Sequence, residues 1–282
     1  FRLHVTDVRS LEGMPETSLR AAESLAREEG REGWVFTLAA PSFFPFMQHC
    51  PSSTLRREMY LAKMAVGAAG DAYDNRELIR RLVNLRLELA QLLGSKSFAE
   101  KVLARRMAGS TTAVYRLLDE LLEAYKPLAE KELAAVADFA REAGATLPLQ
   151  PWDWSYWAER YKQAFYELDE EELRPYFELS RVSDAIFSMA TRLYGIRFTE
   201  RTDLPVYHSD VHTYEVHDAD GSYLGLLYTD FFPREGKQSG AWMNNLQEQY
   251  HTAEGEDHRP HIVLVMNFTQ PTADRPALLT PG

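Results

Sequence analysis

The chain has 282 residues, of which 45% are hydrophobic and 26% charged, and its formal net charge is −11. This size and apolar content suit one large or two ordinary folded domains and exclude a wholly disordered chain. The acidic balance argues against nucleic acid as a partner, because a phosphate-binding surface needs an excess of basic side chains. No apolar run reaches the roughly 18 residues of a membrane span, so no membrane partner is predicted.

The ends of the chain and its single cysteine bear on its origin. Cys50 has no second cysteine to pair with, so the fold does not depend on an oxidising compartment. This fits a cytoplasmic location and leaves the periplasm open. The chain opens on Phe1, with neither an initiator methionine nor a signal-peptide pattern. We therefore expect an internal piece of a longer protein.

Up to about residue 195 the apolar residues recur at helical spacing. The clearest case is 74–94, which is expected to begin with capping-box spacing and to end at a glycine. Further helices are predicted in 110–144, 151–168, 169–177 and 181–195. The stripe of the first helix consists of leucines three and four residues apart: Leu78, Leu82, Leu85, Leu89 and Leu92.

Two prolines and one acidic turn bear on where these predicted helices begin, kink or end. Pro127 predicts a kink or a break in 110–144, because proline removes a backbone donor and clashes with the preceding turn. Pro151 suits the first turn of the helix that follows it. Asp169 and Glu172 have capping spacing, and the acids around them are interpreted as favourable charges at a helix N-terminus rather than a general acid/base pair.

After Gly195 the period shortens to two residues, which is typical of strands. Strands are predicted within 196–200, 211–216, 222–231 and 261–268. The residues 218–221 are predicted to form a hairpin turn, and 248–261 to form an exposed loop. The predicted fold class is mainly α, of the α+β type: a multi-helix array over 1–195, followed by a small, mostly antiparallel sheet over 196–282.

The stretch YHSDVHTYEVH, residues 207–217, raises the question of a metal site. His208 and His212 could share a metal only if the residues between them were helical, and alternation from Val211 favours a strand. A strand points His212 and His217 to opposite faces. No His-Glu-x-x-His motif occurs in the chain. We interpret the stretch as a surface strand and predict neither metal ligands nor catalytic residues.

The segment GKQSGAWM, residues 236–243, has two glycines around a lysine and then resumes an apolar run. Glycine there permits close backbone approach by another strand or by an extended ligand. A plain transition from loop to strand is the alternative interpretation.

Several phrases in a fixed order carry a family resemblance: LHVTDVRSLEGMP, LELAQLLG, ELRPYF, YGIRFTERTDLPVYH, REGKQSGAWM, VMNFTQP and PALLT. Together they resemble the middle of peptidyl-dipeptidases (dipeptidyl carboxypeptidases), within the zinc metallopeptidase family of thimet oligopeptidase and oligopeptidase A. The resemblance covers essentially the whole chain. It implies a zincin-like, mostly helical ellipsoid split by a channel that admits short peptides and excludes folded proteins.

The resemblance implies that the parent protein hydrolyses short peptides, releases C-terminal dipeptides and uses zinc. In the family, zinc is held by a His-Glu-x-x-His helix that begins shortly after the segment matched by PALLT. This chain has no such motif, so no zinc ligand and no catalytic residue carries over. We expect the chain itself to hold no cofactor and to be inactive. Two alternatives stay open: a naturally truncated, non-catalytic module that binds peptides or a protein, and a parent that is an endo-oligopeptidase.

One transfer from the family concerns substrate binding. In proteases of this zinc class the substrate lies antiparallel to an edge strand and pairs with it through the backbone. By resemblance, the substrate-binding residues here are Gly240, Ala241 and Trp242, with 266–268 in a neighbouring strand. A piece of a larger protein also exposes apolar surface, so self-association is expected.

Overall fold

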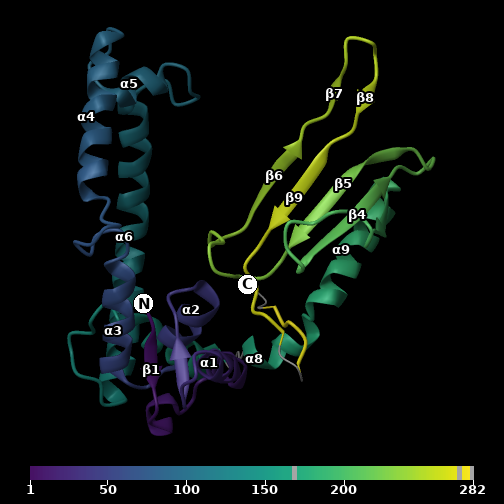
Figure 1. The fold of residues 1–282 in the computed structure, drawn as a ribbon. Helices are drawn as coiled ribbons and strands as arrows, with labels where there is room; N and C mark the ends of the chain where they lie inside the picture. Colours follow the sequence, from purple (N-terminus) through teal and green to yellow (C-terminus); the bar gives the residue numbers. More distant parts are fainter. Residues whose placement is uncertain (167–169, 272–274, 280–282) are drawn as a thin grey trace. The chain divides into compact units, whose positions relative to one another are not determined.

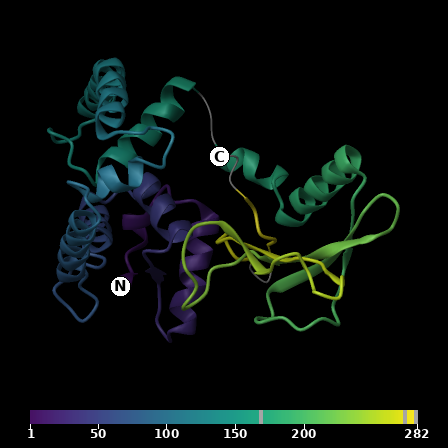
Figure 2. The same cartoon turned by 90° about the horizontal axis from the view of Figure 1, so that it is seen from above.

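The structure is a computed structural model that describes residues 1–166, 170–271 and 275–279 (Figures 1 and 2). The chain forms two compact units, one comprising Phe1–Pro51 with Tyr166–Gly282 and the other Ser52–Phe165. We describe each unit by itself. Within the described residues, no helix combines the length and the apolar content needed to cross a membrane.

The amino-terminal segment builds a small layer of its own. It contains β1 (Leu3–Val5), a 3-10 turn, α1 (Glu16–Glu28), β2 (Trp34–Phe36) and α2 (Ala40–His49), with β1 and β2 antiparallel. Its buried side chains include Leu11, Phe36, Phe46, Met47 and Cys50. The sequence periodicity did not predict this sheet, because strands of three residues are too short to show a period of two.

The second unit is helical and contains α3 (Ser53–Met64), α4 (Arg76–Leu92), α5 (Phe98–Leu103), α6 (Thr111–Glu142) and most of α7 (Trp154–Tyr166). The predicted helix in 74–94 is confirmed as α4. Helix α6 runs through Pro127 without interruption. The alternative of a break is therefore wrong, because one lost hydrogen bond removes only a small part of so long a helix. Helix α7 begins three residues after Pro151, which does not occupy its first turn.

The leucine stripe of α4 is present and is not packed. Its five members, Leu78, Leu82, Leu85, Leu89 and Leu92, are between 44% and 84% exposed among the described residues. Within α4 only Ala90 is buried. The periodicity correctly located the apolar face, but it carries no information about what covers that face.

The chain then changes from helix to sheet. After α8 (Glu170–Leu173) and the 3-10 turn Arg174–Tyr176, α9 (Leu179–Tyr194) ends at Gly195. Gly195 has φ +77°, and a Cβ there would lie 2.8 Å from the side chain of Ala219. Glycine is thus required at the point where the sequence period changes. Asp169, part of the predicted capping pair, lies outside the described residues.

A five-stranded sheet occupies the carboxy-terminal part. Its strands are β3 (Arg197–Glu200), β4 (Val211–His217), β5 (Tyr223–Asp230), β6 (Trp242–Gln247) and β9 (His261–Val265), in the spatial order β3-β4-β5-β9-β6 (Figure 1). All neighbours are antiparallel except β5 and β9, which are parallel. The prediction of a mostly antiparallel sheet after a helical region is confirmed.

The segment predicted as a loop between strands, 248–261, forms a hairpin instead. Its strands are β7 (Tyr250–His251) and β8 (Asp257–His258), which pair antiparallel beyond the ends of β6 and β9 (Figure 1). The rings of Tyr250 and His258 stack with centroids 4.6 Å apart. The strands have only two residues each, and their polar sequence hides the alternation that would reveal them.

The two faces of the five-stranded sheet differ. One face carries a buried cluster of Val211, Tyr228, Val263 and Val265. On the other face, Phe187 of α9 packs against Phe198 and Tyr214, with ring centroids 4.3 and 4.9 Å away. Helix α9 therefore covers the β3–β4 side of that face (Figure 2).

Candidate functional site

Strand β6 lies at one edge of the five-stranded sheet. Among the described strands it pairs only with β9, so the outer side of its backbone has no strand beside it. Its side chains, from Trp242 to Leu246, are exposed. An exposed strand edge presents a row of N–H and C=O groups that another extended chain can pair with.

The three residues predicted to bind substrate come together at the beginning of this edge. Trp242 is the first residue of β6, and Gly240 and Ala241 lead directly into it. Gly240 has φ +105°, a conformation that residues with a Cβ rarely adopt. The side chain of Asn267 donates to the carbonyl oxygens of Gln238 and Gly240 at 3.0 and 2.8 Å. The structure thus fixes where these residues lie, while their binding of substrate stays a prediction.

A row of paired residues crosses the sheet from this edge. Trp242 pairs with Val265, Val265 with Asp230, and Asp230 with Val211. Residues paired in this way point to the same face of a sheet. The first residue of β6 therefore lies in register with Asp230, an aspartate that is only 1% exposed.

Asp230 is the last residue of β5, and charged and polar side chains surround its carboxylate. Arg234 donates to both carboxylate oxygens at 2.8 Å, in the bidentate arrangement that fits a planar guanidinium. Lys237 donates to Oδ1 at 2.8 Å, and the hydroxyl of Tyr207 donates to Oδ2 at 2.8 Å. We call these four residues the Asp230 cluster.

The cluster has a definite charge state at neutral pH. Burial alone would raise the pKa of Asp230, but hydrogen bonds from Arg234, Lys237 and Tyr207 hold it well below its usual range. Burial, together with the hydrogen bond to Asp230, raises the pKa of Tyr207 to about 12. Asp230 is therefore ionised, and Tyr207 is a neutral donor.

Sequence reasoning missed the Asp230 cluster. Its signal is a spacing: an aspartate at the end of an apolar strand, followed by arginine four residues later and lysine seven residues later. In a polar loop such charges are usually solvated, and only the position of β9 beside β5 shows that this aspartate is buried.

From Val211 onward the histidine-rich stretch forms strand β4, as predicted, and its histidines do not lie together. The Nδ1 atom of His212 lies 2.7 Å from Oε1 of Glu200 on β3. The Nδ1 atom of His208 lies 3.6 Å from a carboxylate oxygen of Asp210. Across residues 1–166, 170–271 and 275–279, no three His, Cys, Asp or Glu side chains come together in a way that could hold a metal ion.

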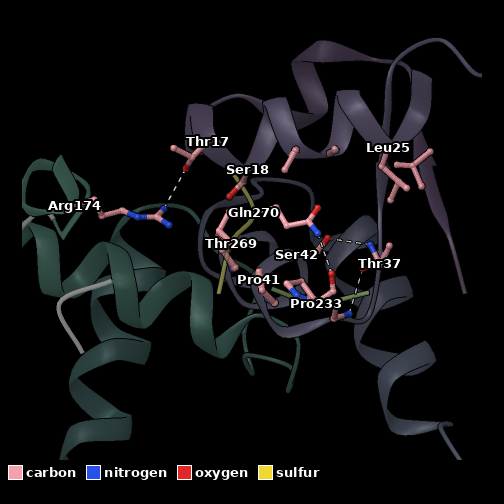
Figure 3. Close-up of a pocket in the computed structure, with 15 residues that line it drawn as sticks. Thr17, Ser18, Leu25, Thr37, Pro41, Ser42, Arg174, Pro233, Thr269 and Gln270 are labelled. Atoms are coloured by element: carbon pink, nitrogen blue, oxygen red, sulfur yellow. Dashed lines mark hydrogen bonds between the residues drawn. The ribbon is translucent and has the colours of Figure 1, made fainter. Parts of the chain in front are cut away.

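A separate pocket of about 160 Å³ lies between α1, β2 and α2 on one side and Pro233, Thr269 and Gln270 on the other (Figure 3). Arg174 contributes to its wall and donates to Thr17 at 3.1 Å. Gln270 donates to the carbonyl oxygen of Pro233 at 3.1 Å, and so joins the pocket to the loop that precedes β6. Hydroxyl, alanine and proline side chains dominate the described lining, which includes no carboxylate that could act as an acid or base.

The comparisons with known proteins identify the family. The sequence profile of peptidase family M3 matches residues 46–282, which is most of the chain. The chain belongs to this family of zinc metallopeptidases.

Curated relatives agree over nearly the whole chain. Oligopeptidase A of Escherichia coli is 39% identical over 280 residues, which are 98% of this chain and 41% of the relative. Dipeptidyl carboxypeptidase of Escherichia coli is 37% identical over 279 residues, 98% of this chain and 40% of the relative. Saccharolysin of Saccharomyces cerevisiae is 28% identical, over 95% of this chain and 39% of the relative. The chain thus spans about two fifths of the length of these relatives.

The family uses zinc, and the described residues of this chain do not fit that ion. A zinc site needs three protein ligands around an open position, or four in a structural site. The described part of the chain brings no such group together. What it does supply is an open strand edge and the buried charges behind it.

Proposed function

We propose that this chain is the part of an M3 peptidase that holds a short peptide in an extended conformation along strand β6. The observation that carries the proposal is the edge position of β6, with Gly240, Ala241 and Trp242 at its beginning. Backbone pairing with an edge strand recognises a peptide largely independently of its side chains. This suits an oligopeptidase that acts on short peptides.

The two edges of the sheet differ in a way that favours β6. Strand β3, at the opposite edge, begins at Arg197 and ends at Glu200, and Glu200 is engaged by His212. Charged residues on an edge strand oppose pairing with another chain. Strand β6 carries no charged residue among its six positions. A peptide therefore meets less opposition at β6.

We propose further that the whole protein releases dipeptides from the carboxy terminus of its substrates. The supporting finding is the dipeptidyl carboxypeptidase among the relatives at 37% identity. Oligopeptidase A, at 39% identity, supports the alternative of internal cleavage. A free-acid peptide and its amidated form distinguish the two, because an enzyme that reads the terminal carboxylate loses most of its activity on the amide.

The binding test uses an acetylated, fluorescent hexapeptide of alternating leucine and alanine and the 282-residue chain. In an extended peptide, alternate N–H groups point to opposite sides. Two versions are therefore N-methylated at alternate residues, one at the odd and one at the even positions. We expect one version to lose at least tenfold in affinity and the other to bind like the parent peptide, measured by fluorescence anisotropy. Equal binding of all three peptides would rule out backbone pairing.

The cleavage test uses the same chain, the unmodified peptide and added zinc. We propose that the chain alone leaves the peptide intact, which chromatography of the products measures. Chelator-sensitive cleavage by the purified chain would contradict this.

A further inference from the structure

We propose that the Asp230 cluster is a positioning device that fixes the loop 231–241 and thereby sets strand β6 for peptide binding. The inference rests on the proposed role of β6 and adds the residues that act through it. None of the cluster's residues belongs to β6 itself, so they act on the peptide only through the backbone they hold.

Lys237 is the centre of the device. Its ammonium group donates to the carboxylate of Asp230 at 2.8 Å and to the backbone carbonyls of Asp230 and Phe232 at 3.1 and 2.6 Å. Its side chain is only 4% exposed. One buried cation thus joins the end of β5, the first residues of the loop and, through its own backbone, the middle of the loop. A lysine has three donors, and all three are used here.

Arg234 fixes a second point of the same loop. Its two hydrogen bonds to Asp230 constrain the direction of the guanidinium as well as its distance, because they are parallel. Tyr207, from the segment before β4, completes the carboxylate's partners. Two points of the loop are therefore held against a single buried carboxylate, whose own backbone is fixed in the sheet: its carbonyl oxygen accepts from Met266 N at 2.7 Å.

The second half of the loop is held from the other side. After β9 the chain supplies Asn267, which donates to the carbonyls of Gln238 and Gly240, and Gln270, which donates to the carbonyl of Pro233. Between Asp230 and Trp242, the loop thus has fixed points near its start, its middle and its end. These contacts constrain the direction in which the chain enters strand β6.

The arrangement has a cost that a plain loop would not require. A buried carboxylate and a buried ammonium each lose their hydration, and their attraction only offsets that loss when the geometry is good. The fold meets this requirement with four short hydrogen bonds on one carboxylate. The position of the cluster gives a reason for this energetic cost. Asp230 is in register with Val265 and, on the far side of Val265, with Trp242, at the end of the edge where the predicted substrate residues lie.

The test compares Lys237→Met, Lys237→Arg and the control Arg201→Met in the 282-residue chain. Methionine keeps the apolar stem and removes the charge and the donors. Arg201 forms ion pairs with Asp203 and Glu215 near the opposite edge of the same sheet. The two readouts are binding of the fluorescent hexapeptide and its two N-methylated versions, and hydrogen exchange of the backbone amides.

We expect Lys237→Met to weaken peptide binding at least tenfold and to reduce the difference between the two N-methylated versions. We expect its amides in 242–247 to exchange at least tenfold faster, while those of β4 and β5 keep their protection. Lys237→Arg should restore part of both properties, and Arg201→Met should change neither more than twofold.

Two results would overturn the inference. The first is an unchanged exchange rate in 242–247 in Lys237→Met, because β6 would then be set without the cluster. The second is faster exchange spread equally over β4, β5 and β6, because the cluster would then stabilise the whole sheet rather than position one strand. Both readings stand even when the wild-type chain binds no peptide, an outcome that would remove only the proposed role of β6.

Discussion

Each unit of the molecule contains a buried aspartate that forms an ion pair with an arginine, and the two pairs have different roles. In the helical unit, Asp153 accepts from Arg56 at 2.7 Å and from Ser53, so it ties α3 to the segment before α7, about a hundred residues later. Asp230 instead accepts from Arg234 and Lys237, four and seven residues later in the same loop. The long-range pair fixes the packing of helices, and the short-range cluster shapes one loop.

A structural ion pair and a positioning one differ in what surrounds them. Arg56 is also stacked over the ring of Tyr156 at 4.2 Å and donates to the backbone of Trp152, and both of these partners belong to the helical unit. The Asp230 cluster instead holds the loop that leads into an open strand edge. Removal of the Arg56–Asp153 pair should therefore lower the stability of the helical unit. Removal of the Asp230 cluster should instead lower the affinity of β6 for a peptide.

Asp153→Ala should have the largest effect. It leaves the guanidinium of Arg56 buried without that carboxylate, and breaking a buried pair in this way costs about 3–5 kcal/mol. Urea denaturation followed by circular dichroism measures the loss. As a control, Asp138→Ala removes an exposed partner of Arg141 on α6 and should cost less than about 0.5 kcal/mol. Similar losses in both variants would contradict the structural role of Asp153.

Asp230→Asn should come next, and its effect should be on binding. Asparagine keeps the shape and one acceptor but cannot balance two cations, so the loop 231–241 is expected to relax. A tenfold loss of affinity for the fluorescent hexapeptide, about 1.4 kcal/mol, is the expected result. Hexapeptide affinity within twofold of wild type would place Asp230 in the same structural class as Asp153.

The exposed leucines of α4 give a third contrast between the two regions. Apolar side chains left in water favour association, so the helical unit should drive self-association of the chain at high concentration. The double variant Leu82→Glu/Leu89→Glu should lower the mean mass measured by light scattering. The matched control, Met243→Glu/Leu246→Glu on β6, should leave the mass unchanged. A clean monomer in the unmodified chain would show that the stripe does not act in this way.

Tyr207 gives the smallest expected effect. Because its folded pKa of about 12 lies above the ordinary value of 10.0, its contribution to stability is fully present below pH 10 and is lost as the pH rises toward 12. Tyr207→Phe should lower the free energy of unfolding by about 1 kcal/mol at neutral pH. It should also remove the tyrosine ionisation expected near pH 12. Absorbance at alkaline pH measures this, and a loss of amplitude near pH 10 rather than near pH 12 would remove Tyr207 from the cluster.

The sequence was sufficient to predict the elements that are long enough to show a clear period, and to recognise the family resemblance. It was insufficient to predict contacts between distant residues. The helix of 74–94 and the strands β3, β4, β5 and β9 follow from periodicity, whereas the substrate role of Gly240 to Trp242 comes from the family resemblance and stays a prediction. The strand order cannot be read in this way, because β9 enters between β5 and β6 from later in the chain. The burial of Asp230 depends on that order, so its cluster could not be predicted.

The place of β9 in the sheet also determines when the candidate site can exist during synthesis. Strands β3, β4 and β5 pair in the order in which they leave the ribosome, but β6 has to wait for residues 261–265 before it has a neighbour. Until then, the segment 231–247 has no strand to join, and Asp230 lacks the neighbouring strand beside which it is buried. A chain that ended near residue 255 would contain β6 without its partner strand and would therefore lack the proposed peptide-binding edge. Strand β9, which follows β6 in the chain, is thus the strand that completes the proposed site.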